Sequence, residues 1–399
     1  MPTFSIVIPT RARADTLQHT LKTVLNQTFT DIEVIVHESG ADPATAKLLA
    51  GISDPRLRFW STGEPVPMTE NWERALDHVR GDYVMYVGDD DGLLPDSCML
   101  AKYFFDSGAA DVLTSLRAVY YWPGYGDPQW RNRLEAQYGT TLKFTIKDTH
   151  AHLATIFRFE EIFVRLPMLY YSFVSRRLID QIRAARGRYF FGAAPDVISG
   201  IVNCHFTGRF ALCNRPIALG GASHHSTGYR AGQSGDSAAR DEASKAAFGE
   251  MKIHPTMANS VSRSLTLAVG NEYLLAKEEL FPFKPPAIDY TAMLSRAARE
   301  INNVPGWYES ISEEILWIAA RNNVPSESIA IPPRISSREP PQDRKCLGVR
   351  EVVPGIVTVD LDGNALGVMN VFDASLYFER ILPVFRSAPE IIIEPVRAE

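Results

Sequence analysis

The first hundred residues alternate strand-like and helix-like segments, and this alternation constrains the fold more than any other feature. Short apolar runs rich in β-branched residues at 4–8 and 32–36 predict buried strands. Between them, leucine and valine side chains over 17–25 recur at the spacing of an amphipathic helix. Strands and helices in this order predict an α/β fold with a mostly parallel sheet and helices on both faces.

The pattern repeats further along the chain and ends in a run of acids. Apolar residues over 72–79 predict a second helix, and the strand predicted at 82–87 leads directly into Asp89, Asp90 and Asp91. Ligands of parallel sheets bind beyond the carboxyl ends of the strands. Three polar loops are predicted at such ends, over 9–13, 37–42 and 88–92.

Composition narrows the class of protein. The 399 residues are 45% hydrophobic and 22% charged, as in an ordinary globular protein. At about 150 residues per domain, this length predicts two to three domains that fold without disulfides or metals. The net charge of −6 disfavours nucleic acid as a partner. The four cysteines form no CxxC pair, and neither a signal peptide nor a transmembrane run is recognised, so we expect a cytoplasmic protein.

The acidic run predicts a bound cation. Three adjacent carboxylates repel one another, so an apolar strand that ends in Asp89, Asp90 and Asp91 indicates an offsetting charge. Oxygen ligands favour Mg²⁺ or Mn²⁺ over zinc, and Mg²⁺ commonly bridges protein carboxylates and substrate phosphates. Taken alone, the run is explained equally well by an acidic loop in contact with solvent or by carboxylates that cap the N-terminus of a helix.

With its surroundings, the acidic run resembles the family 2 glycosyltransferases of GT-A fold. Three segments carry the resemblance: S-I-V-I-P-T-R-A-R at 5–13, L-N-Q-T-F-T-D-I-E-V-I-V at 25–36, and N-W-E-R-A-L-D-H-V-R-G-D-Y-V-M-Y-V-G-D-D-D at 71–91. Their order and spacing are specific together, whereas each segment alone is weak. The resemblance is good over about the first hundred residues, loose over about the next 130, and nearly absent over the last 150.

The resemblance implies a metal site and a donor site. Asp91 and Asp89 would bind Mn²⁺ or Mg²⁺, and Asp90 or Asp89 would contact the ribose or a metal-bound water. One of His224 and His225 would complete the metal site, the alternative being a pair of solvent-exposed histidines. Further donor contacts are implied for Pro9, Thr10, Arg13, Glu38 and Asn71, with Tyr229 and Arg230 near the diphosphate on a flexible loop.

The nucleotide pocket departs from the family pattern at two places. The chain reads H-E-S-G at 37–40 where D-D-G-S is usual, and R-A at 11–12 where Y-N is common. Glu38 stands where the family has an aspartate that contacts the base, the alternative being an exposed loop acid. We therefore expect a UDP-sugar, with the identity of the base left open.

An inverting transfer also needs a general base for the acceptor hydroxyl. The family supplies an acid roughly a hundred residues beyond the metal motif, often where a helix begins. The segment F-F-G-A-A-P-D-V-I-S-G at 190–200 matches that position, so the resemblance implies that Asp196 is the base. A carboxylate that merely stabilises the helix dipole is the alternative.

The rest of the chain is divided by composition. We expect a glycosyltransferase domain at 1–225, with a nucleotide-binding half at 1–100 and an acceptor half at 101–225, then a flexible loop at 226–240, a helical extension at 241–330, a Pro-rich linker at 331–345, and a small C-terminal α/β element at 346–399. Expected partners are a nucleotide-sugar donor and a glycan or lipid-linked acceptor of surface polysaccharide or glycoconjugate biosynthesis. Peripheral membrane association and homo-oligomerisation through the C-terminal region stay open.

Two other functions are compatible with the predicted sheet. A sugar-nucleotide nucleotidyltransferase needs a Gly-rich basic loop after the first strand, and P-T-R-A-R-A-D at 9–15 lacks the glycines. A non-catalytic carbohydrate- or nucleotide-binding module of GT-A type is left open by the changes at 11–12 and 37–38, although the intact acidic run argues against it. A dinucleotide dehydrogenase is disfavoured because no GxGxxG follows the first strand.

Overall fold

The computed structural model describes residues 1–226, 248–249, 251–258, 263–282, 286–335, 348–382 and 389–393. Its main sheet is formed by β1 (Phe4–Thr10), β2 (Ile32–Glu38), β3 (Leu57–Ser61), β4 (Tyr83–Tyr86), β6 (Val112–Ser115), β9 (Lys143–Asp148), β10 (Phe173–Ser175), β11 (Arg209–Cys213) and β15 (Glu390–Ile393). The strand order is β15-β9-β11-β6-β10-β4-β1-β2-β3. Five of the neighbouring pairs are parallel and three are antiparallel, which confirms the mostly parallel sheet.

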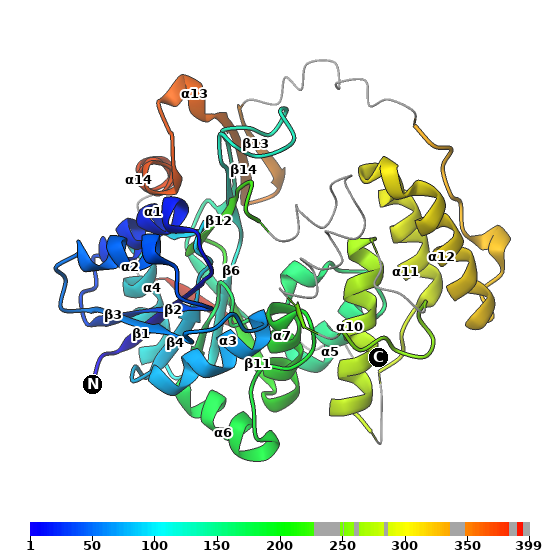
Figure 1. The fold of residues 1–399 in the computed structure, drawn as a ribbon, viewed down its shortest axis with the longest axis horizontal. Helices are drawn as coiled ribbons and strands as arrows, with labels where there is room; N and C mark the ends of the chain where they lie inside the picture. Colours follow the sequence, from blue (N-terminus) through cyan, green and yellow to red (C-terminus); the bar gives the residue numbers. More distant parts are fainter. Residues whose placement is uncertain are drawn as a thin grey trace.

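Helices cover both faces of this sheet, as predicted (Figure 1). The helices are α1 (Ala14–Leu25), α2 (Pro43–Ala50), α3 (Met68–Ala75), α4 (Ser97–Asp106), α5 (Thr149–Phe157), α6 (Arg176–Arg186), α7 (Pro195–Phe206), α10 (Leu265–Leu280), α11 (Tyr290–Glu300), α12 (Tyr308–Arg321), α13 (Gly363–Leu366) and α14 (Val371–Ile381). Short 3₁₀ segments lie at Leu76–His78, Phe163–Arg165, Ile301–Asn303, Pro305–Trp307 and Ser326–Ser328.

Successive residues of β1 explain why both faces are covered. Ile6 and Ile8 point into a core shared with Leu17 of α1, whereas Val7 points into a second core shared with Trp72 of α3. Side chains alternate between the two faces of a strand. A strand that is apolar at every position therefore needs apolar cover on each side.

A second sheet, which the sequence analysis did not predict, joins the C-terminal segment to the middle of the chain. It consists of β5 (Gly92–Leu93), β7 (Ala118–Tyr121), β8 (Arg133–Gly139), β12 (Ala218–Ala222), β13 (Gly348–Val353) and β14 (Ile356–Asp362), in the order β13-β14-β8-β7-β12-β5. Strand β14 pairs with β8 from Ile356↔Gly139 to Asp362↔Arg133, and Arg133 forms an ion pair with Asp360 across the two strands. The C-terminal strands β14 and β15 thus extend sheets built by earlier residues.

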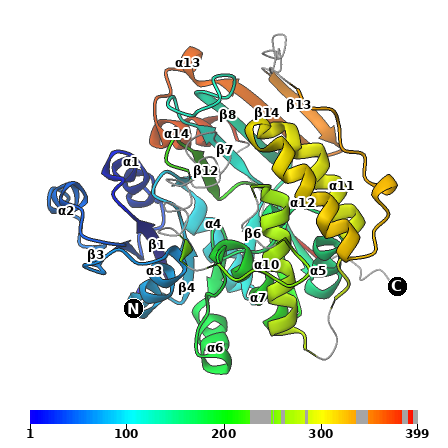
Figure 2. The ribbon, with the colours of Figure 1, turned by 45° about the vertical axis from the view of Figure 1, so that its right-hand side comes forward.

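The helical region after residue 263 packs on the main domain rather than standing apart. Helix α10 lies against α7, and α11 lies against α10 (Figure 2). Leu267 and Tyr273 of α10 belong to the same core as Val197 of α7. The helical C-terminal region therefore shares its core with the sheet.

We expect the C-terminal helix α14 to stabilise the whole chain. Phe378 of α14 is fully buried in a core with Tyr120 and Leu134 of the second sheet. Phe378→Ala should lower the free energy of unfolding by about 3–5 kcal/mol, because a large apolar side chain leaves a cavity. The measurement is denaturant unfolding of the full chain.

The matched control is Met369→Ala, an exposed position beside the same helix, which should change stability by no more than about 0.5 kcal/mol. A Phe378→Ala variant as stable as the control would mean that the C-terminal segment does not support the fold.

Candidate functional site

The acidic run lies in the loop between β4 and β5 and is almost fully buried. Asp89, Asp90 and Asp91 are 3%, 5% and 1% exposed. Because β1 and β4 are neighbouring parallel strands, their carboxyl ends meet at one edge of the sheet. The run therefore lies beside the residues that follow β1, as the sequence predicted.

The first acid is held by the end of β1 and the start of α1. The Thr10 hydroxyl donates to Asp89 Oδ2 at 2.7 Å, and Arg13 Nη1 lies 3.0 Å from Asp89 Oδ1. Between them, Ala12 adopts a φ of +51°, in the left-handed region that favours glycine and asparagine. This turn places the guanidinium of Arg13 against Asp89, so two of the predicted donor residues meet the acidic run.

The second acid binds the turn that follows β12. The hydroxyls of Ser223 and Ser226 donate to Asp90 Oδ2 at 2.5 and 2.8 Å. Burial, together with the negative charges of Asp91 and Asp89, raises the pKa of Asp90 to about 7.

The third acid is fixed by backbone amides and a tyrosine. The N–H groups of Gly221 and Gly88 donate to the Asp91 carboxylate at 2.6 and 2.8 Å, and the Tyr170 hydroxyl donates to Oδ2. Burial raises the pKa of Asp91. Gly221 has to be glycine, since a Cβ there would lie 1.7 Å from the carbonyl oxygen of Asp90.

The donor set of the acidic run fits a hard divalent cation. Among the described residues, the acidic run forms one ion pair, between Asp89 and Arg13. When all three acids are ionised, the negative charges of Asp90 and Asp91 therefore have no ion-pair partner among these residues. Asp89 accepts two hydrogen bonds, whereas a carboxylate offers about four lone-pair sites. The amides that orient Asp91 resemble the supporting hydrogen bonds of a ligating carboxylate. Asp89 and Asp91 are thus suited to hold Mg²⁺ or Mn²⁺ by charge and by ligand type.

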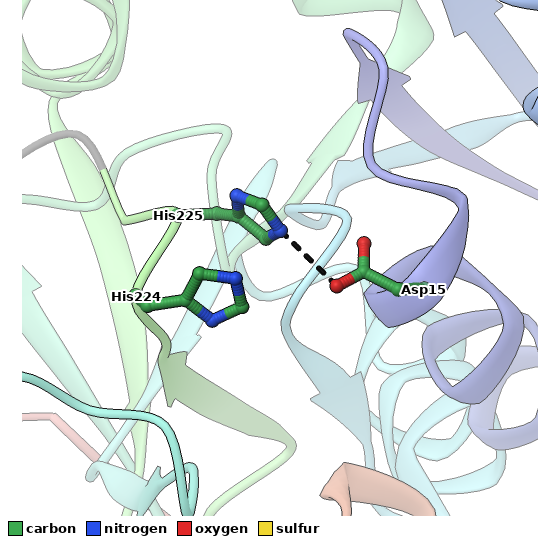
Figure 3. A group of neighbouring side chains, drawn as sticks. All are labelled: Asp15, His224 and His225. Carbon is green, nitrogen blue, oxygen red and sulfur yellow. Dashed lines mark hydrogen bonds and ion pairs between the residues drawn. The ribbon is translucent and has the colours of Figure 1, made fainter.

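The two histidines lie beside Asp15 of α1 (Figure 3). Asp15, His224 and His225 each offer a ligand atom, and these atoms all lie within 4.8 Å of one another. His225 Nε2 lies 3.1 Å from Asp15 Oδ2. Within the described part of the chain, no other set of three His, Cys, Asp or Glu side chains has ligand atoms this close together. The carboxylates of the acidic run do not belong to this group.

The donor residues predicted on β1 and β2 lie at the same sheet edge. Pro9 is buried beside His37, and Thr10 is the register partner of Glu38. Glu38 is buried, and its Oε1 accepts a hydrogen bond from the Asp42 N–H at 3.2 Å. Burial raises the pKa of Glu38. Its carboxylate therefore organises the loop after β2, whichever further contact it makes.

Asn71 and a histidine missed by the sequence analysis form a second group here. Asn71 Nδ2 donates to the His37 carbonyl at 3.1 Å, and Asn71 Oδ1 lies 2.8 Å from His37 Nδ1. The His37 ring lies near that of His78, which stacks on Trp60 at a centroid distance of 4.1 Å. The departure from the family pattern at residue 37 is the signal that would have pointed to this aromatic group.

Asp196 lies in the first turn of α7, as predicted from its spacing. Burial raises the pKa of Asp196, and the rise is opposed first by backbone hydrogen bonds, among them that from the Val197 N–H, and then by the positive charge of Arg117. Arg117 also lies 6.0 Å from the centre of the Tyr171 ring, beside Tyr170. Arg117 thus connects the surroundings of Asp196 to the tyrosines that face Asp91.

Glu272 of α10 is a site residue that the sequence analysis missed. It is 4% exposed, and its Oε2 accepts hydrogen bonds from the N–H groups of Ala193 and Ala194 at 2.9 and 3.4 Å. These residues lead directly into α7. The helical extension therefore holds the loop that carries Asp196, and no local motif around residue 272 signals this contact. Tyr229, Arg230 and most of the predicted loop at 226–240 lie outside the described residues.

The N-terminal part of the chain is similar to known glycosyltransferases. Residues 5–163 match the model of the family described as glycosyl transferase family 2. The chain is 29% identical over 115 residues to the GalNAc(5)-diNAcBac-PP-undecaprenol beta-1,3-glucosyltransferase of Campylobacter jejuni, covering 28% of this chain and 37% of that protein. It is 23% identical over 132 residues to an uncharacterised protein of Mycobacterium tuberculosis, covering 33% of this chain and 40% of that protein. The matches thus span well under half the length of either relative.

Solved structures of TarS from S. aureus also match. One covers 82% of this chain and 54% of that chain, at 14% identity and a TM-score of 0.45. Another, of TarS residues 1–349 in complex with UDP-GlcNAc, covers 81% of this chain and 92% of that chain, at 13% identity and a TM-score of 0.44.

Residues 5–163, which match the family 2 glycosyltransferase model, contain most strands of the main sheet and the acidic run. The mostly parallel sheet and the acidic run at the carboxyl end of β4 are compatible with this similarity. Among the described residues, no helix is both long enough and apolar enough to cross a membrane.

We expect Asp90 to make stability depend on pH. Its folded-state pKa of about 7 lies above its ordinary value, so the folded state holds a proton that the unfolded state has released. Stability should therefore fall as pH rises from about 4 to 7. Asp90→Asn removes this ionisation, so the variant should gain stability relative to the wild type as the pH rises from 5 to 8 in EDTA.

The measurement is denaturant unfolding at several pH values, with the exposed Glu64→Gln as control. Parallel pH profiles for the wild type and Asp90→Asn would contradict the raised pKa.

Proposed function

We propose that this chain is a metal-dependent inverting glycosyltransferase that moves a sugar from a nucleotide-sugar donor, a UDP-sugar in the first instance, to a hydroxyl of a glycan or lipid-linked acceptor. The observation that carries the proposal is the convergence of the end of β1, the start of α1, the turn after β12 and Tyr170 on one buried acidic run. Burying three carboxylates together costs folding free energy unless a positive charge offsets theirs. A bound cation would offset the negative charge of the carboxylates and would attract the diphosphate of the donor.

The donor side follows from charge. A diphosphate is repelled by uncompensated carboxylates, so Asp91 and Asp89 would hold Mn²⁺ or Mg²⁺, which supplies the positive charge that the leaving diphosphate needs. Arg13, already against Asp89, is placed to contribute a second positive charge. Pro9, Thr10 and Glu38 would line the nucleotide side, since they lie at the same sheet edge. Asn71 of α3 would join them, because its side chain is hydrogen-bonded to His37 of β2.

The acceptor side depends on Asp196. As the acceptor oxygen attacks the anomeric carbon, its proton passes to the Asp196 carboxylate, and the bond from that carbon to the diphosphate oxygen breaks with its electrons going to the diphosphate. The raised pKa of Asp196 makes it a stronger base than an exposed aspartate. Glu272 fixes the loop that positions it. A single displacement inverts the anomeric configuration.

The Campylobacter relative is a GalNAc(5)-diNAcBac-PP-undecaprenol beta-1,3-glucosyltransferase, which supports a lipid-linked glycan as the acceptor class. The experiment that tests the function is a screen of nucleotide-sugar donors, with products and released nucleotide identified by mass spectrometry. Nucleotide binding without turnover of any donor would favour the non-catalytic binding module instead.

Nucleotide binding should require the divalent cation and Asp91. UDP at one hundred times its Kd, with Mn²⁺, should stabilise the wild type by about 2.7 kcal/mol, because the ligand binds the folded state only. EDTA should remove this gain, and Asp91→Asn should lack it although its unfolding without ligand remains cooperative. Thermal unfolding with and without Mn²⁺ measures both. Full UDP stabilisation in EDTA would rule out the proposed metal.

Turnover should depend on Asp196 independently of donor binding. Asp196→Asn should lower kcat by at least about a hundredfold, since general-base assistance is worth about 10²–10⁴ in rate. The Mn²⁺-dependent stabilisation by UDP should be unchanged, because the proposed base does not contact the diphosphate. The control is Asp180→Asn, an exposed aspartate on α6. Near-normal turnover in Asp196→Asn, or a product with retained configuration, would overturn this role.

A further inference from the structure

We infer that Asp15, His224 and His225 form a second metal site, distinct from the acidic run, that takes a zinc-like transition-metal ion. The three ligand atoms lie within 4.8 Å of one another and come from two elements, the first turn of α1 and the turn after β12 (Figure 3). Tetrahedral ligands with bonds of about 2.0–2.2 Å lie about 3.4 Å apart, so a contraction of the group by up to about 1.4 Å brings all three atoms onto one ion. Three protein ligands leave a fourth position for water or an external ligand.

The ligand types separate this site from the proposed donor site. Two imidazole nitrogens and one carboxylate oxygen favour Zn²⁺ or Co²⁺, whereas the all-oxygen acidic run favours Mg²⁺ or Mn²⁺. The geometry also separates them, since the Asp91 carboxylate is turned towards Gly88, Gly221 and Tyr170. No residue is shared between the two ligand sets.

The turn that carries the histidines is fixed before any metal binds. Ser226 Oγ accepts a hydrogen bond from the Ser223 N–H at 2.8 Å, and Ser223 Oγ accepts one from the His225 N–H at 3.0 Å. Both hydroxyls also donate to Asp90. His224 packs close to Gly124, where a Cβ would lie 3.3 Å from its Nδ1. The site is therefore largely organised, and binding needs little reordering of the backbone.

A metal bound here would connect two segments that contact the acidic run, the start of α1 and the turn after β12. Asp15 stands two residues after Arg13, which pairs with Asp89, and His225 stands two residues after Ser223, which binds Asp90. An ion bound by Asp15 and the histidines would cross-link these segments. It would stabilise the arrangement around Asp89 and Asp90 without contacting either of them.

The test uses Co²⁺ and the full chain, with no nucleotide present. Four-coordinate cobalt with nitrogen ligands gives strong visible ligand-field bands, whereas six-coordinate cobalt among oxygen ligands absorbs weakly. The wild type should develop the strong bands, and Zn²⁺ should displace them and raise the unfolding midpoint. Asp15→Asn and His225→Gln should each weaken Co²⁺ binding by at least about tenfold, because each removes a ligand.

The matched control is Asp91→Asn, which should keep the bands because Asp91 is not a ligand of this site. Loss of the bands in Asp91→Asn would place the histidines in the donor metal site and overturn the inference. Retention of the bands in an Asp15→Asn, His225→Gln double variant, or their absence from the wild type at millimolar Co²⁺, would also overturn it. None of these outcomes depends on nucleotide binding or turnover, so failure of the proposed glycosyltransferase function would be seen separately.

Discussion

Burial of three adjacent carboxylates at the end of β4 is the constraint on which the rest of the site depends. Each acid is satisfied by a different part of the chain: Asp89 by the end of β1 and the start of α1, Asp90 by the turn after β12, and Asp91 by two glycine amides and Tyr170. Buried charges without such partners destabilise a fold strongly. The acidic run therefore draws together segments that are more than a hundred residues apart.

The second sheet and the helical extension position groups that hydrogen-bond to the residues of the candidate site. Strand β12 carries Gly221 and leads into Ser223, so the sheet that holds β12 also sets the position of the donors to Asp90 and Asp91. The C-terminal strand β14 pairs with β8 in the same sheet, and Glu272 of α10 holds the loop before α7. Strand β14 and helix α10, which show no resemblance to the family, thus support residues in the part of the chain that does. Packing and hydrogen bonding do not follow sequence similarity.

Several features of the site were predictable from local sequence. The acidic run follows an apolar strand, and parallel strands end at one edge, so its proximity to Thr10 and Arg13 followed from pattern alone. The pairing of His225 with Asp15 did not, because the two residues meet only through the packing of α1 against β5, which pairs with β12. The same holds for Glu272, whose role depends on helix packing and leaves no local motif.

The sequence by itself determined the class of fold, the two-sided burial of the main sheet and the location of the acidic run. These depend on the period of apolar residues and on neighbouring residues in the chain, which are local properties. Only the tertiary structure decided which groups satisfy each carboxylate, that the C-terminal strands complete both sheets, and that the histidines face α1. Those contacts join residues far apart in sequence, and their partners are selected by the packing of the whole chain, which no short segment specifies.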